Sequence, residues 1–143
     1  MTTPAPEPDR SDLALQEVVR AALSRYPHEA ATVELRFVDG AGMWFTEVTP
    51  TRQGAARLHI AVDGDDLNVL VGHTWFEIFG GTADLARITD LAEAVFAGRV
   101  EESATTSGAF ARIYAADGMW NVGVMHLPMP WRWRRPRRYL PYA

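Results

Sequence analysis

Histidine and carboxylate side chains are the groups of this chain most able to do chemistry. His73 and Glu77 are four residues apart, a spacing that would place both on one face of a helix. The surrounding segment is instead typical of a strand, on which four residues span about 13 Å, too far for both to bind one metal ion. His59 and His126 fall on other predicted strands and His28 in a loop, so we expect scattered histidines rather than a composite site.

Three further patterns resemble known motifs without meeting their requirements. Asp63, Asp65 and Asp66 lie close together, but no glutamate follows at the position that an EF-hand needs, and strands flank the cluster. The segment Gly80–Thr82 precedes a helix but has neither the GxGxxG pattern nor a phosphate-binding lysine. Ser107 is followed by glycine outside the GxSxG frame. We therefore predict a non-enzymatic protein with no cofactor and no metal.

Two residue types are missing from the chain, and their absence removes whole classes of chemistry. The sequence has no cysteine, which excludes disulfides, thiolate nucleophiles and cysteine-bound zinc. All fourteen basic residues are arginine, so Schiff-base chemistry through lysine is excluded as well. A GC-rich genome accounts for this preference for arginine.

The segment from Pro130 to Ala143 is basic and aromatic, and no acidic residue follows Asp117. It holds five of the arginines, and without them the net charge of the chain changes from −4 to −9. An acidic body with a cationic end indicates a charged partner. The three prolines of this segment argue against a regular helix.

Three partners are compatible with this basic segment. Arginines and tryptophans can bind phosphates and stack on bases of nucleic acid, although the acidic body would repel the backbone. The same residues can lie on an anionic membrane. They can also dock on an acidic protein surface, either that of the chain itself or that of a partner, and we favour this interpretation because arginine matches carboxylates and aromatic residues anchor interfaces.

Tryptophans in the predicted strands suggest a second binding surface. Trp75, Glu77 and Phe79 share one face of their strand, opposite Phe76 and Ile78, and only one of those faces can lie under helices. The other face is either a binding surface or a surface covered by one of the chain ends. The residues that we assign to partner binding are Trp44, Trp75, Glu77, Trp120, Trp131, Arg132, Trp133, Arg134, Arg135, Arg137 and Arg138.

Hydrophobic periodicity predicts the elements that position these residues. Apolar residues at three- and four-residue steps predict helices over Ser11–Tyr26 and from Thr82 to Phe96, capped at Asp9 or Ser11 and at Thr82. Period-two alternation predicts strands at Val33–Phe37, Met43–Val48, Leu58–Val62, Leu67–Val71 and Thr74–Phe79, and two or three more between Arg99 and Leu127. Because short turns join these strands, we predict an α+β fold: a single twisted antiparallel sheet with two helices packed on one face.

The predicted organisation is one domain with two appendages. Residues 1–10 are rich in proline and are expected to form a flexible N-terminal arm, residues 11–127 the single α+β domain, and residues 128–143 the basic aromatic tail. No stretch is apolar enough for a signal peptide or a membrane span, so we expect a cytoplasmic protein with no transmembrane segment.

Three short motifs between Leu58 and Val122 carry a resemblance to known proteins. They are the FEIFG strand end, the AEAVFAGRVEE helix exit and the YAADG turn. The region resembles small uncharacterised α+β proteins of GC-rich bacteria, some of which look like immunity proteins encoded beside polymorphic toxins. The resemblance implies an acidic protein that occludes a basic toxin and uses no cofactor. The alternative is an adaptor that binds nucleic acid or an anionic membrane through its tail.

Overall fold

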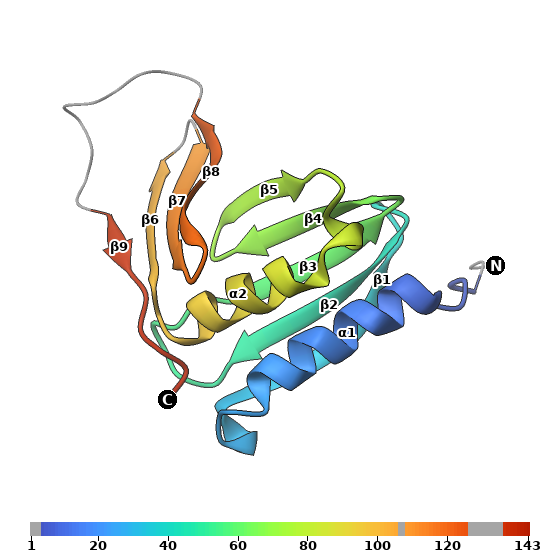
Figure 1. The fold of residues 1–143 in the computed structure, drawn as a ribbon, viewed down its shortest axis with the longest axis horizontal. Helices are drawn as coiled ribbons and strands as arrows, with labels where there is room; N and C mark the ends of the chain where they lie inside the picture. Colours follow the sequence, from blue (N-terminus) through green and yellow to red (C-terminus); the bar gives the residue numbers. More distant parts are fainter. Residues whose placement is uncertain (1–3, 106–107, 126–135) are drawn as a thin grey trace.

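The computed structural model describes residues 4–105, 108–125 and 136–143, and it contains helices and antiparallel strands in the order expected of an α+β protein (Figure 1). The helices are α1 (Arg10–Leu23) and α2 (Leu85–Phe96), with short 3-10 turns η1 (His28–Ala30) and η2 (Gly81–Ala83). The strands are β1 (Ala31–Val38), β2 (Met43–Pro50), β3 (Leu58–Asp63), β4 (Asp66–Val71), β5 (Thr74–Ile78), β6 (Val100–Thr105), β7 (Gly108–Ala115), β8 (Gly118–Met125) and β9 (Arg137–Arg138).

The first five strands form an antiparallel sheet in sequence order, β1-β2-β3-β4-β5. Alternate residues of each strand point to one side, where Val48, Leu58, Ile60 and Val69 join the hydrophobic core. The turn between β3 and β4 places Gly64 at a φ of 62°, a left-handed conformation that favours glycine. Short turns of this kind force consecutive strands to pair, which is why this part of the fold could be predicted.

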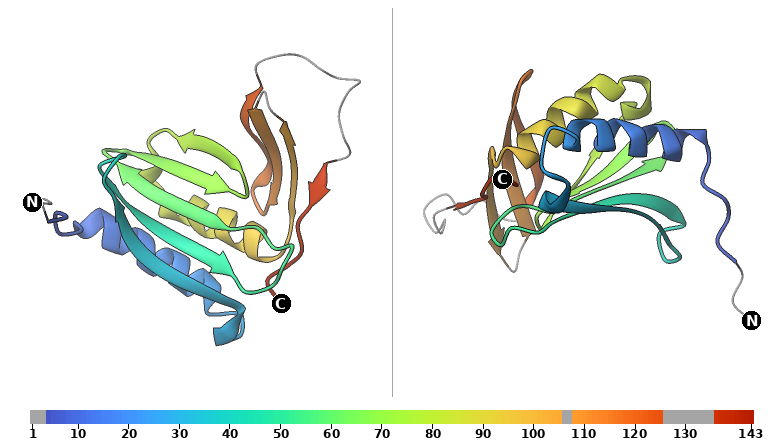
Figure 2. Two further views of the ribbon diagram at one scale, coloured as in Figure 1. Left: turned by 180° about the vertical axis from the view of Figure 1, so that it is seen from behind. Right: turned by 90° about the horizontal axis from the view of Figure 1, so that it is seen from below.

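Both helices pack on one face of this sheet, as predicted (Figure 2). The start of α1 is fixed by a capping box, in which the side chains of Asp9 and Asp12 each accept a hydrogen bond from the other residue's backbone N–H. Leu15 and Val19 of α1 and Leu91 and Phe96 of α2 are buried and belong to the hydrophobic core. None of the helices in the described residues is long and apolar enough to cross a membrane.

The later strands form a second, four-stranded sheet, so the prediction of a single sheet was wrong. Its order is β8-β7-β6-β9, and it stands beside the first sheet with β7 against α2 and β8 against β5 (Figure 1). The second sheet arises from the connection between β5 and β6, which contains α2. A short turn forces the next strand to pair with the last one, whereas α2 carries the chain across the first sheet and delivers β6 to a different place.

The ends of the helices and the basic segment also differ from the prediction. The first helix ends at Leu23 rather than Tyr26, and Ser24 donates its backbone N–H to the last turn. Thr82 does not cap the second helix, because it lies within η2 and donates its hydroxyl to the Asp65 carbonyl. The basic segment contains no helix in residues 136–143, but Arg137–Arg138 form the short strand β9.

Candidate functional site

The surface that collects most of the predicted binding chemistry is the face of the five-stranded sheet opposite the helices, which we call the outer face. Strand register determines its membership, because residues paired across strands point to the same side. One row across the strands is Arg36, Phe45, Ala61, Asn68 and Glu77, and the next is Glu34, Glu47, His59, Leu70 and Trp75.

Aromatic side chains dominate the β5 side of the outer face. The rings of Phe45 and Trp75 meet edge to face, with their centroids 5.9 Å apart, although two strands separate β2 from β5. Phe45 and Leu70 are buried, while Trp75 is 52% exposed. Phe79, directly after β5, is 78% exposed. The outer face therefore offers a partly exposed indole above an apolar floor, a composition typical of interface centres.

Carboxylates make the outer face acidic. Glu47 accepts two hydrogen bonds from the guanidinium of Arg36, at 2.8 and 2.9 Å, and lies directly opposite Glu34 across the two strands. Glu77 is exposed beside Trp75. The Arg36 guanidinium thus pairs with Glu47 and has Glu34 as its other carboxylate neighbour, whereas Glu77 lies on β5 at the opposite edge of the sheet.

His59 extends this cluster without adding a positive charge. Its Nδ1 lies 3.3 Å from a carboxylate oxygen of Glu47, close enough for an ion pair if the imidazole were protonated. Burial, however, lowers the pKa of His59 below its usual value of 6.5 and outweighs the opposing attraction of Glu47. The imidazole is therefore neutral at pH 7, and the outer face keeps its negative charge.

The three tryptophans of the predicted strands lie in three different places. Only Trp75 is on the outer face. Trp44 faces the helix side of β2, where its indole stacks at a tilt on Phe37 and donates a hydrogen bond of 3.1 Å to the Pro6 carbonyl. Trp120 lies on β8 under the guanidinium of Arg87 and donates to Asp117.

The end of the basic segment docks on the chain's own domain. Arg137 and Arg138 pair with Glu102 and Glu101 of β6 as strand β9, and the Arg138 guanidinium binds the Glu101 carboxylate at 3.0 Å. The guanidinium of Arg137 lies over the ring of Tyr139, 5.0 Å from its centroid. Trp131, Arg132, Trp133, Arg134 and Arg135 lie outside the described residues.

Beyond β9, two tyrosines enter the core and form what we call the C-terminal joint: Gly72, Glu102, Tyr139 and Tyr142. The Tyr139 hydroxyl donates to the buried Glu102 carboxylate, which also accepts from the hydroxyl of Thr74 and the backbone N–H of His73. The Tyr142 hydroxyl donates to the Ala56 carbonyl at 2.6 Å.

The joint links the two sheets and leaves little free space. Gly72 has a φ of 61°, and a Cβ there would overlap the Tyr139 hydroxyl and the Glu102 carboxylate. Desolvation raises the pKa of Tyr139 above its usual range, helped by the Glu102 carboxylate, and burial likewise raises the pKa of Tyr142. Both hydroxyls therefore stay protonated as donors, and the joint is a structural unit rather than a reactive one.

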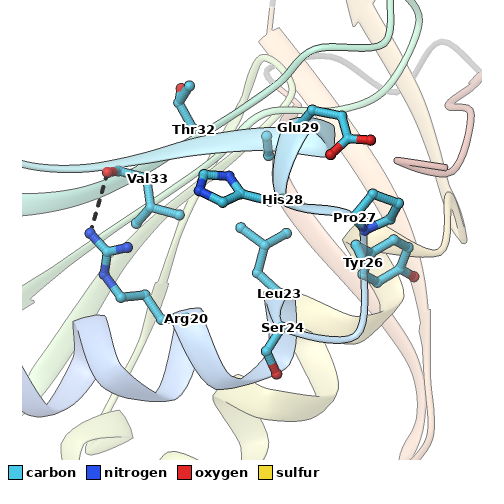
Figure 3. Close-up of a pocket in the computed structure, with 10 residues that line it drawn as sticks. Arg20, Leu23, Ser24, Tyr26, Pro27, His28, Glu29, Thr32 and Val33 are labelled. Atoms are coloured by element: carbon cyan, nitrogen blue, oxygen red, sulfur yellow. Dashed lines mark hydrogen bonds between the residues drawn. The ribbon is translucent and has the colours of Figure 1, made fainter.

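A groove lies between the C-terminal end of α1 and β1. It has a volume of about 710 Å³, and Leu23, Tyr26 and Val33 line it together with polar side chains such as Arg20 and His28. Figure 3 shows Leu23 and Arg20 reaching from α1 into the space beside β1, where Arg20 donates to the Val33 carbonyl at 3.5 Å. The sequence pattern did not indicate this groove.

The histidines do not form a metal site among the described residues. His59 is on the outer face, His28 lines the groove, and His73 occupies the β4–β5 turn, while His126 lies outside the described residues. No group of three metal-binding side chains occurs in residues 4–105, 108–125 and 136–143.

Sequence reasoning found Trp75 and Glu77 but missed their neighbours Phe45, Glu47 and His59. Part of the signal was in the sequence, because all three lie on predicted strands and His59 alternates with the core residues Leu58 and Ile60. Only the strand register, which pairs β2 with β3, shows that these three side chains lie on the same face as Trp75 and Glu77. Comparisons with protein-family models, with curated proteins and with solved structures found no match.

Proposed function

We propose that this chain is a non-enzymatic protein-binding module that uses its outer face to bind a cationic protein. The observation that carries the proposal is a half-exposed Trp75 on the same face as Glu47 and Glu77, with an exposed Phe79 directly after β5. Aromatic residues in the centre of an interface supply most of its binding free energy. The surrounding carboxylates select a basic partner and speed its association.

An immunity-like role, the neutralisation of a basic toxin, fits this chemistry. Inhibition by occlusion needs a rigid, complementary surface and no catalytic group. Both sheets are tied together by the C-terminal joint, so the outer face is carried by a rigid scaffold. The net charge of the chain is −4 even with all five arginines of the basic segment, and this negative charge favours encounter with a cationic enzyme.

The alternative, an adaptor that binds nucleic acid or a membrane through its tail, loses part of its support. Arg138 is paired with Glu101, and Tyr139 and Tyr142 are buried in the domain. These residues serve the chain's own fold, which leaves the segment from Trp131 to Arg135 for such an adaptor. This docking uses the chain's own acidic surface, one of the two protein surfaces that our interpretation of the basic segment left open.

The test is capture and reconstitution. The wild-type chain is used to capture proteins from its host, and any candidate is purified and titrated against wild type, Trp75→Ala and Glu77→Arg by calorimetry. Loss of the indole should weaken the complex by at least about 30-fold, the effect of a hot-spot tryptophan. Leu13→Ala is the matched control, because Leu13 is an exposed apolar residue on α1.

Two outcomes would contradict the proposal. One is a purified complex whose affinity is the same for wild type and for both outer-face variants. The other is binding of RNA, DNA or anionic liposomes that disappears when the chain is truncated after Met129. The product of a neighbouring gene that is toxic alone and harmless with this chain is the first partner to test.

A further inference from the structure

Strand β1 is an open edge of the five-stranded sheet. Among the described residues it pairs with β2 alone, and it lies at one side of the sheet with α1 beside it (Figure 1). An edge strand presents unpaired backbone N–H and C=O groups that can bind another strand. What such an edge can bind depends on which of its residues point outward.

Two hydrogen bonds identify those residues. The Ala30 carbonyl accepts from the Thr51 N–H, so even-numbered residues of this segment direct their backbone groups toward β2. The Val33 carbonyl points the other way, where it accepts a hydrogen bond of 3.5 Å from the guanidinium of Arg20. Val33, Leu35 and Phe37 therefore present their N–H and C=O groups to the open side.

The side chains of these same three residues form an apolar stripe that is only half-buried. They point toward the helix side of the sheet, as their register with Val48 and Thr46 requires. Helix α1 contacts the sheet mainly at β2 and β3, so it does not close over the β1 edge. The edge thus combines backbone groups that have no partner strand among the described residues with an incompletely covered apolar surface.

We propose that β1 docks against β1 of a second copy of this chain, antiparallel and about a two-fold axis at Leu35. In this register Leu35 pairs with itself, and its N–H and C=O bind those of its counterpart. Val33 pairs with Phe37 of the second copy, and Phe37 with its Val33. All six of these backbone groups on each copy then find partners, and the two sheets become one continuous sheet.

The charges of β1 are complementary to themselves in this register. Glu34 stands opposite Arg36 of the second copy, and Arg36 opposite its Glu34. Glu34 makes no ion pair within the described residues and already faces the carboxylate of Glu47. The guanidinium of Arg36 is exposed at 62%, so it can serve a second carboxylate besides Glu47. A shift of register by two residues would remove both opposite-charge pairs.

The groove beside β1 receives the second copy. Phe37 of that copy lies opposite Val33, which lines the groove together with Leu23 and Tyr26. Its ring covers apolar surface that is open in one copy alone. Trp75 lies on β5, at the far edge of the sheet, so the dimer leaves the aromatic part of the outer face available for a partner.

Cysteine cross-linking tests the register, because the chain has no cysteine of its own. In Leu35→Cys the two sulfur-bearing residues face each other with Cα atoms about 5.5 Å apart, within the range that a disulfide spans. In Val33→Cys, the matched control, the two cysteines are about 13 Å apart. Mild oxidation should give a covalent dimer of Leu35→Cys and little of Val33→Cys, resolved by non-reducing electrophoresis.

Light scattering after size exclusion gives the second measurement, which needs no change at the apolar stripe. Wild type should form a dimer in a series up to about 100 μM, since mass action governs a weak association. Glu34→Arg should weaken the dimer about tenfold by placing like charges opposite each other. Glu77→Arg makes the same charge change on β5 and should leave the dimer intact.

Three results would overturn the proposal. They are a wild-type chain that stays monomeric through the series, equal cross-linking of Leu35→Cys and Val33→Cys, and a dimer that Glu34→Arg does not weaken. None of them bears on the outer-face proposal, whose test is the loss of a heterologous complex by Trp75→Ala.

Discussion

The C-terminal joint and the outer face are built from the same residue types and differ in what surrounds them. Each combines aromatic rings with a glutamate. In the joint, Tyr139 and Tyr142 are buried and Glu102 accepts three hydrogen bonds. On the outer face, Trp75 and Glu77 are exposed to solvent.

Under the proposed function, this difference separates residues that stabilise the fold from residues that bind a partner. A buried carboxylate is tolerated only when its acceptors are satisfied, and the groups that satisfy it are then committed to the fold. The exposed pair keeps its binding capacity for another molecule. Residue type alone therefore could not have told the two regions apart, although both contain aromatic residues near charges.

The strongest way to test this contrast is Tyr142→Ala. Removal of a buried aromatic ring that packs on Phe96 should lower the free energy of unfolding by about 3–5 kcal/mol. Urea denaturation measures the change. Tyr142→Phe is the control, because it keeps the ring and loses only the bond to Ala56, at a cost of about 1 kcal/mol. An effect of Tyr142→Ala near zero would mean that the C-terminal end is not part of the core.

A smaller effect is expected for Tyr139→Phe. Glu102 would keep two donors and lose the third, which leaves a buried carboxylate oxygen unsatisfied at a cost of about 1–3 kcal/mol. Arg138→Ala removes a surface ion pair on the neighbouring strand position and should cost at most about 1 kcal/mol. If Arg138→Ala were the more harmful substitution, surface pairing rather than the buried hydrogen bond would hold the tail.

Trp75→Ala should change the free energy of unfolding by no more than about 1 kcal/mol, because half of the indole is already exposed. Combined with the expected loss of a partner, this result would establish that the outer face serves binding. A loss comparable with that of Tyr142→Ala would show that Trp75 is a structural residue like the tyrosines of the joint.

The spacing of apolar residues and the turn residues made both helices and most of the first sheet predictable. Gly64, for example, marks a tight turn, and a tight turn fixes the pairing of its neighbours. The second sheet was not predictable in the same way, because α2 separates β5 from β6 and no local rule says where a strand pairs after a helix. The docking of Tyr139 on Glu102 depends on residues 37 positions apart, and neither residue signals the other.

The smallest expected effect concerns pH at the outer face. Because burial lowers the pKa of His59 in the folded chain, the unfolded chain takes up the proton more readily. The contribution of neutral His59 to stability is therefore complete above about pH 6.5 and is lost as the pH falls below it. Unfolding of wild type and His59→Gln by urea, at several pH values from about 7.5 to 5, measures the difference.

Wild type should lose more stability than His59→Gln over that range. Parallel curves would mean that His59 has the same pKa in the folded and unfolded chains. The C-terminal joint should not contribute to this pH dependence, because the raised pKa values of Tyr139 and Tyr142 keep both hydroxyls protonated throughout that pH range.

The position of Tyr142 also has a kinetic consequence. Its hydroxyl meets the Ala56 carbonyl across 86 residues of chain, whereas the hairpins of the first sheet join neighbours. Contacts of such long sequence separation carry a high loop-closure cost and tend to form after the local ones. We therefore expect Tyr142→Ala to accelerate unfolding far more than it slows folding, so that the joint governs how long the native state persists once it has formed.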